Sequence, residues 1–198
     1  GIKLRKENRV VLAICGDGAT SSGEWYEAVN WAAVQKLPVV FLVENNRYAI
    51  STPIEQQMAV RNIADKAQGL GLPGYIVDGM DVFTVQKELS RIVEATRRGA
   101  GPSLVEARVY RLTPHSSDDD DRLYRTREEV MEYKERDPLR TAHLRLEREA
   151  VLTQADFQHM EERASELLHQ AIDYAQRTPL PPPESGYDHL FAGEVAHA

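Results

Sequence analysis

The sequence predicts an α/β protein built on an open, mostly parallel sheet with helices on both faces. Short apolar runs alternate with helical stretches through residues 1–112. The runs are continuously apolar, which is typical of parallel strands that are buried on both faces. Proline or glycine stands where the intervening helices end, as these residues commonly do.

Composition sets limits on function. The 198 residues are 42% hydrophobic and 28% charged, as in an ordinary globular domain. The net charge of -7 argues against a nucleic-acid partner, and no apolar run approaches the roughly 18 residues of a membrane span. The lone Cys15 excludes an intramolecular disulfide and fits a reducing compartment. Because the sequence lacks an initiator Met and its first strand comes early, we expect an incomplete N-terminus.

The first predicted unit is strand, helix, strand. Residues 10–15 form an apolar run that predicts a strand buried on both faces, and residues 39–43 form a second one. Between them, Ser21 or Ser22 can cap a helix that Pro38 ends. This order predicts a βαβ unit, which places the two strands in parallel.

The same pattern continues along the chain. We expect a helix over 59–69, a strand at 75–77, a helix from Asp81 to about Arg98, and a strand over 103–109. Residues 113–125 read as a loop, and the charge balance changes there, from a net +2 over 1–112 to a net -9 over 113–198. The remaining segments are predicted as three helices and a Pro-rich tail, at 126–135, 138–149, 153–177 and 179–198. The predicted organisation is therefore an α/β core over 1–125, a helical extension over 126–178 and the tail.

Two polar turns follow the first two strands. Asp17 stands between two glycines, and Asn46 lies 29 residues later, which is one βαβ distance. Ligands of open α/β sheets bind beyond the carboxyl ends of the strands, and carboxylate and amide oxygens suit Mg²⁺. Glycine also allows close approach of backbone N–H groups to phosphate. The pair therefore predicts a metal-bound diphosphate, although Gly-Asp-Gly alone is commonly just a turn, and the spacing fits neither a P-loop nor a dinucleotide fingerprint.

These residues resemble a known family. Gly16-Asp17-Gly18 followed by Asn45-Asn46 is similar to the fingerprint of thiamine-diphosphate enzymes. The segments 44–53, 73–82 and 115–119 are more narrowly similar to the alpha subunit of the first component of 2-oxoacid dehydrogenase complexes, in its branched-chain (2-oxoisovalerate) form. The likeness runs through nearly the whole chain and corresponds to the C-terminal half of that subunit.

The resemblance implies a thiamine-diphosphate-binding fold and a set of site residues. Asp17, the Asn46 side chain and the Tyr48 carbonyl match the Mg²⁺ ligands, and Gly18 and Ala19 match the backbone against the diphosphate. His115 matches the family's catalytic histidine, which faces the cofactor and takes part in acyl transfer to a lipoyl group.

The loop that carries His115 has several interpretations. From composition alone, the run Asp118 to Asp121 is a solvated loop or, without the usual spacing, a Ca²⁺ site. The resemblance implies a loop that becomes ordered when cofactor binds, and Ser116 matches a position that is phosphorylated in animal relatives. We also expect Arg122, Tyr124 and Arg125 to brace the loop through charge-assisted bonds.

The resemblance further implies partners and an activity. The activity is oxidative decarboxylation of a branched-chain 2-oxo acid, with pyruvate and acetoin types as alternatives. The implied partners are a beta subunit in a two-alpha, two-beta assembly, the lipoyl domain of the acyltransferase component and the N-terminal half of the alpha subunit, without which we expect little activity. Such proteins occur in the bacterial cytoplasm or the mitochondrial matrix. The remaining hypothesis is an interaction module without catalysis.

Overall fold

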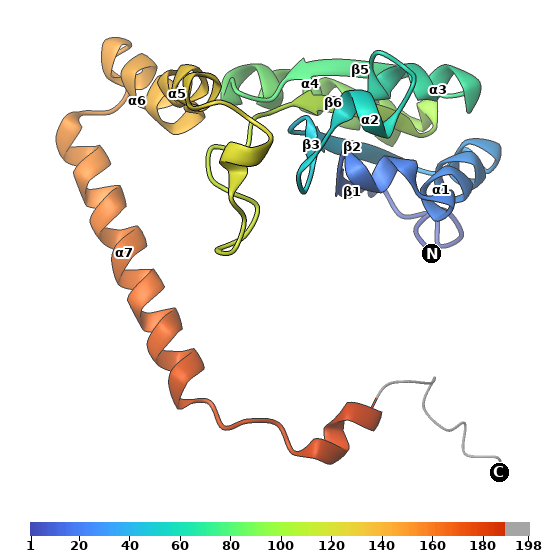
Figure 1. Cartoon of the computed structure of the whole chain (residues 1–198). Helices are drawn as coiled ribbons and strands as arrows, with labels where there is room; N and C mark the ends of the chain where they lie inside the picture. Colours follow the sequence, from blue (N-terminus) through green and yellow to red (C-terminus); the bar gives the residue numbers. More distant parts are fainter. Residues whose placement is uncertain (189–198) are drawn as a thin grey trace. The chain divides into compact units, whose positions relative to one another are not determined.

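The computed structural model describes residues 1–188 (Figure 1). It contains two compact units, Gly1–Arg145 and Leu146–Ala198, and each is described by itself. Residues 189–198 of the predicted Pro-rich tail lie outside the described part of the chain.

The first unit is built on a four-stranded parallel sheet. Its strands are β1 (Val11–Gly16), β2 (Val39–Asn45), β5 (Gly74–Asp78) and β6 (Ser103–Arg108). They lie in the order β1-β2-β6-β5, and β1 pairs with β2 from Val11 opposite Val39 to Gly16 opposite Glu44. All pairings are parallel, so the α/β fold class that the sequence predicts is confirmed. The loops after β1 and β2 therefore lie together at the carboxyl end of the strands.

Helices cover both faces of this sheet. On one face, the helix α1 (Gly23–Val34) packs its buried Trp25 and Val29 against Val43 of β2 and Leu104 of β6. On the other face, α4 (Val82–Ala95) packs around the buried Ile92. Neighbouring residues of one strand serve opposite faces because side chains alternate along a strand. The caps follow the sequence as well, since Ser22 accepts the Trp25 N–H and Asp81 accepts the Phe83 N–H.

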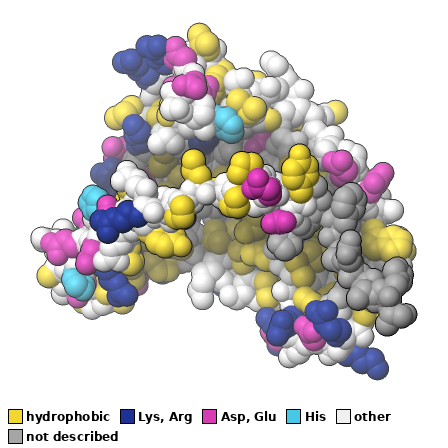
Figure 2. Space-filling view, turned by 90° about the horizontal axis from the view of Figure 1, so that it is seen from below, with side chains coloured by type: hydrophobic (Ala, Val, Ile, Leu, Met, Phe, Trp, Pro, Cys, Tyr) yellow, Lys and Arg dark blue, Asp and Glu magenta, His cyan; other side chains and the backbone are white. Residues whose placement is uncertain are grey.

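The prediction that the first strand is buried on both faces is wrong. Val11, Leu12 and Ile14 of β1 are 44–56% exposed. The reason is its place in the sheet, because β1 is an edge strand whose outer side has no neighbour in the described chain. Trp31 and Val34 on α1 are exposed too, and Figure 2 shows that hydrophobic side chains gather in groups on the molecular surface.

The connections between the sheet strands differ in one place from the prediction. Instead of a helix over 59–69, a short 3-10 turn η2 (Ile63–Asp65) leads into α3 (Lys66–Gly69). Asn62 is extended, and its side chain caps the turn together with Asp65, so residues 58–62 stay non-helical. A hairpin of β3 (Tyr48–Ala49) and β4 (Thr52–Pro53) leads into the short helix α2 (Ile54–Gln57).

Three helices follow the loop, near the predicted positions. They are α5 (Arg127–Glu135), α6 (Pro138–Arg148) and α7 (Gln154–Arg177). Thr153 begins α7 with a capping box that includes Asp156. Among residues 1–188, every helix is too short or too polar to cross a lipid bilayer.

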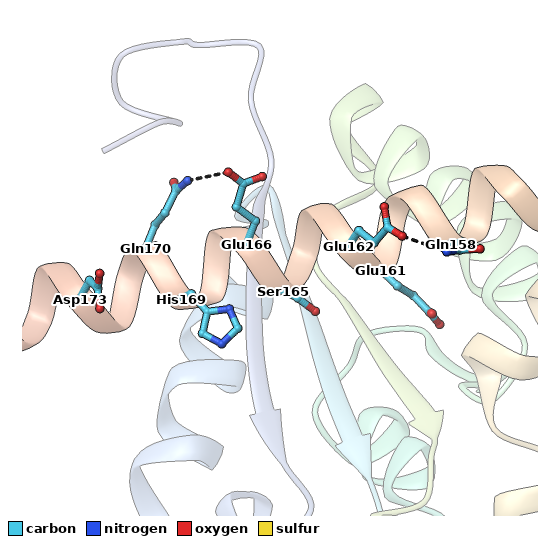
Figure 3. Close-up of a pocket in the computed structure, with 8 residues that line it drawn as sticks. All are labelled: Gln158, Glu161, Glu162, Ser165, Glu166, His169, Gln170 and Asp173. Carbon is cyan, nitrogen blue, oxygen red and sulfur yellow. Dashed lines mark hydrogen bonds between the residues drawn. The ribbon is translucent and has the colours of Figure 1, made fainter.

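The helix α7 carries a hollow of about 800 Å³ on its polar side. All eight side chains that line this hollow come from α7 (Figure 3). Two of the glutamates are held by neighbouring glutamines, Glu162 by Gln158 at 2.9 Å and Glu166 by Gln170 at 3.2 Å. Because one helix supplies every lining residue, the hollow is a feature of an exposed helix surface and encloses no ligand site.

Candidate functional site

The first predicted site residue, Asp17, directly follows β1 and is 1% exposed. Its carboxylate oxygen Oδ2 accepts a hydrogen bond from Nε2 of Gln57 at 2.9 Å. Its backbone carbonyl accepts one from the Thr20 hydroxyl at 2.7 Å, which closes the turn after the strand. A buried carboxylate needs hydrogen bonds or a cation, and here a single side-chain donor reaches it in the described part of the chain.

The turn with Asp17 lies directly against the β3 strand. A Cβ atom built on Gly18 would stand only 2.7 Å from the Cβ of Ala49. Only glycine, which has no Cβ, fits where these two segments come so close together. The segment with Asp17 and the segment with Asn46 and Tyr48 are therefore side by side, as the parallel order of β1 and β2 requires.

The two asparagines after β2 have different environments. Asn45 is buried, and its Nδ2 donates to the buried carboxylate of Glu106 at 2.8 Å, which also accepts the Ala64 N–H. Asn46 is half-buried, and its Oδ1 accepts the Tyr48 N–H at 3.1 Å. An amide oxygen has two lone pairs, so this contact orients the Asn46 side chain and leaves capacity for a cation.

The turn around Tyr48 is strained. Arg47 has a φ of 71° and Ile50 a φ of 58°, and a β-branched residue in this region is unusual. Such conformations cost about 1–3 kcal/mol each and are common at functional sites. The Tyr48 ring is buried, and its hydroxyl donates to the Glu129 carboxylate of α5 at 3.3 Å. Burial, together with the nearby Glu129 charge, raises the pKa of Tyr48, so this ring stays neutral and anchors the turn.

His115, the predicted catalytic residue, lies in the loop between β6 and α5 and is exposed. Its backbone N–H donates to Oδ2 of Asp119 at 2.8 Å, and the Tyr124 hydroxyl donates to the same oxygen. Ser116 is exposed beside it. The Tyr124 ring lies 5.3 Å from the Tyr48 ring, so the base of the His115 loop touches the residue whose carbonyl is the third predicted ligand.

The bracing of this loop by its own charges is confirmed. The Nε–H group of Arg125 donates a hydrogen bond to Asp121 at 2.9 Å. Its other nitrogens donate to the carbonyl oxygens of Arg111 and Thr113. Burial acts to lower the pKa of Arg125, but the bonds to Asp121 outweigh it, so this pKa stands above its ordinary value. Arg122 pairs with Asp120 at 2.6 Å on the surface.

Two residues of the site were not found from the sequence. Gln57 contacts Asp17, and Arg111 donates to both the Ile50 carbonyl at 2.7 Å and the Tyr124 hydroxyl at 2.8 Å. Arg111 thereby joins the strained turn to the His115 loop. Neither position carries a sequence signal, since each role depends on segments that only the fold brings together.

The donor set fits a hard cation that also binds phosphate oxygens. Within residues 1–188 there is no group of three or more His, Cys, Asp or Glu side chains that could hold a metal. One buried carboxylate with amide and carbonyl oxygens nearby is instead the oxygen set that Mg²⁺ uses when phosphates complete its octahedron. Backbone N–H groups suit the diphosphate part of such a ligand, and Gly18 directly follows Asp17 in the chain.

A separate cleft of about 560 Å³ opens at the ends of β2, β5 and β6. Its lining includes Arg47, Arg61, Arg108, Arg136 and Glu106, but none of Asp17, Asn46 and His115. The predicted ligands therefore lie beside this cleft rather than in it.

Comparison with known proteins gives the chain's family. The family model of the dehydrogenase E1 component matches residues 1–184. The chain belongs to the dehydrogenase E1 component family. It is 43% identical over 190 residues to the 2-oxoisovalerate dehydrogenase subunit alpha of Bacillus subtilis, an alignment that covers 96% of this chain and 58% of that protein.

Other E1 relatives are nearly as similar. The pyruvate dehydrogenase E1 component subunit alpha of Bacillus subtilis is 39% identical over 180 residues, with 90% of this chain and 48% of that protein covered. The corresponding Staphylococcus aureus subunit is 38% identical over 178 residues, with 89% and 48% covered. The E1 chain thus spans about half the length of the curated relatives it matches.

Proposed function

We propose that this chain is the cofactor-binding part of the alpha subunit of a 2-oxoacid dehydrogenase E1 component. The observation that carries the proposal is the buried Asp17 beside Gly18 and the Asn46–Ala49 turn, at the edge of the sheet where ligands of such folds bind. In this proposal, Asp17, Asn46 and the Tyr48 carbonyl hold Mg²⁺, and Gly18 and Ala19 lie against the diphosphate of thiamine diphosphate. The bound cofactor supplies the carbon nucleophile that makes decarboxylation of a 2-oxo acid possible.

The protein's own contribution is binding and proton control. The single side-chain hydrogen bond to Oδ2 of Asp17 leaves lone pairs of the carboxylate for a cation, and the strained turn fixes the Asn46 and Tyr48 oxygens. His115 is the proton donor and acceptor that we propose for acyl transfer to a lipoyl group, because an imidazole can serve in either role. Its loop is joined to the turn at Ile50 through Tyr124 and Arg111, which supports the proposal that His115 acts at the same site.

We propose a branched-chain 2-oxo acid as substrate. Its support is the 43% identity to the 2-oxoisovalerate dehydrogenase subunit, together with the run from Tyr48 to Pro53 and the His-Ser-Ser-Asp-Asp loop. The alternative is pyruvate, supported by the 39% identity to the pyruvate dehydrogenase subunit. One methylene in a pocket changes binding by only about 1–3 kcal/mol, so the choice depends on a few pocket side chains.

The proposal includes partner polypeptides. The exposed apolar edge strand β1 is a surface on which a further strand can pair, because an uncovered parallel edge leaves backbone groups and apolar side chains in water. We propose that the part of the alpha subunit outside this chain covers β1, and that a beta subunit and the lipoyl domain of the acyltransferase complete the reaction.

Activity of the assembled enzyme tests this function. We expect decarboxylation of branched-chain 2-oxo acids with an artificial electron acceptor, at a kcat/KM above that for pyruvate. His115→Ala should retain decarboxylation and lose lipoyl acylation. Preference for pyruvate would replace the substrate assignment, and no turnover of any 2-oxo acid in the presence of all subunits would favour the interaction-module hypothesis.

A further inference from the structure

Gln57 is the last residue of α2 and lies half-buried beside the Asp17 turn. Its side-chain nitrogen uses both of its protons, one on Oδ2 of Asp17 at 2.9 Å and one on the Thr52 carbonyl at 2.8 Å. Both of these partners are acceptors. The amide orientation is therefore determined, since a flipped amide would set its oxygen against a carboxylate and a carbonyl.

The oxygen of the same amide has no hydrogen-bond partner in the described part of the chain, although it is shielded from solvent. A buried acceptor without a donor is unfavourable and is uncommon in folded proteins. Such an atom needs an explanation in terms of strain or a missing ligand. The amide that carries this oxygen is the one whose nitrogen is bonded to the Asp17 carboxylate.

We infer that Gln57 is a positioning residue for the Asp17 carboxylate and thereby for the cation that Asp17 binds. By holding Oδ2, the amide fixes the rotation of the carboxylate and directs the other oxygen, Oδ1, to the metal. Partners of metal ligands commonly act in this way. The inference rests on the proposed function, because it assumes that Asp17 binds a cation.

A purely structural role for Gln57 would look different. The backbone of Gln57 also contacts the turn, since its carbonyl lies 3.4 Å from the Ser21 hydroxyl. That contact persists when only the side chain is changed. Replacing Gln57 by Met therefore keeps the backbone tie and the side-chain volume, and removes the amide from Asp17 and Thr52.

The experiment measures binding of Mn²⁺ by electron paramagnetic resonance, at a fixed thiamine diphosphate concentration. Mn²⁺ takes the oxygen ligands that suit Mg²⁺. Wild type, Gln57→Met, Asp17→Ala and the control Gln56→Met are compared in the assembled enzyme, with urea unfolding of each. Gln56 is exposed on the same short helix, so its variant controls for a change of Gln to Met in α2.

We expect Gln57→Met to weaken Mn²⁺ binding by about 10–100-fold, the usual effect of losing a partner of a metal ligand, while Gln56→Met matches wild type. The KM for the 2-oxo acid at saturating Mn²⁺ should change little. If Gln57→Met binds Mn²⁺ as tightly as wild type while Asp17→Ala loses it, the inference is wrong and the proposed function stands. If wild type and Asp17→Ala bind equally, the proposed function fails and the inference fails with it.

Discussion

Gly18 and Ala49 are packed so closely that a methyl group on the glycine would stand 2.7 Å from the Ala49 Cβ. This approach joins the loop after β1 to the hairpin after β2. This contact places the Asp17 carboxylate and the two other oxygens that we propose as ligands on adjoining segments, so the geometry of the candidate site depends on it.

The Gly18→Ala substitution should therefore damage both the fold and the site. Overpacking of this kind costs about 1–3 kcal/mol of unfolding free energy, and we expect urea unfolding to show it. Removal of the opposing methyl in Gly18→Ala/Ala49→Gly leaves only the Cα at 3.5 Å and should restore most of the loss. Gly23→Ala is the matched control, because nothing lies within 4 Å of a Cβ there; equal effects at positions 18 and 23 would refute the packing argument.

The two ion pairs of the His115 loop should differ in strength. The Arg125 side chain is 1% exposed, whereas the side chains of Arg122 and Asp120 are 65% and 43% exposed. Asp121→Asn leaves a buried guanidinium without its charge partner, so we expect a loss of about 3 kcal/mol of unfolding free energy. Asp120→Asn should change nothing measurable, since surface pairs are screened. Similar losses for both variants would contradict the argument that the burial of Arg125 makes its ion pair the more important of the two.

The order of the loop should depend on pH through Asp119. The Tyr124 hydroxyl, and then the His115 N–H, lower the pKa of the Asp119 carboxyl. A lowered folded-state pKa gives stability that is present above the ordinary Asp value of about 3.9 and is lost as the pH falls through the lowered pKa. Nuclear magnetic resonance of the His115 amide should report this transition, and Asp119→Asn should abolish it. A transition that persists in Asp119→Asn would assign it to another group.

The exposed β1 edge predicts assembly. Leu12→Lys should change the unfolding free energy of this chain by no more than about 0.5 kcal/mol, as surface changes do. It should prevent association with the proposed remainder of the alpha subunit. Leu139→Lys, at an exposed position of α6, is the control. Size-exclusion chromatography with light scattering reads the result, and unchanged association of Leu12→Lys would show that β1 is not the contact.

Local patterns predicted most of the fold. Continuous apolar runs located the strands, and the Ser22 and Asp81 caps located two helix starts, because these signals act within a few residues. The burial of β1 was mispredicted, since an apolar run carries no information on whether a neighbour exists. The non-helical stretch 58–62 was missed because Asn62 and Asp65 favour a capped turn over helix propensity.

The site residues also divide into those that a local pattern predicts and those that only the fold brings together. Asp17, Asn46 and Tyr48 belong to a motif whose spacing is set by one βαβ unit, and the structure brings their segments together. Gln57 lies 40 residues from its partner Asp17, and Arg111 lies 61 residues from its partner Ile50. No local sequence pattern predicts contacts over such separations. The roles of His115 and Ser116 remain predictions from the family resemblance.

Calorimetry of Mg²⁺ and thiamine diphosphate binding to the assembled enzyme tests the metal-diphosphate site most directly. We expect wild type to bind thiamine diphosphate only when Mg²⁺ is present, and Asp17→Ala to show no binding heat although its unfolding transition is retained. Binding of equal strength by Asp17→Ala, or none by wild type with all its subunits present, would contradict the proposed site.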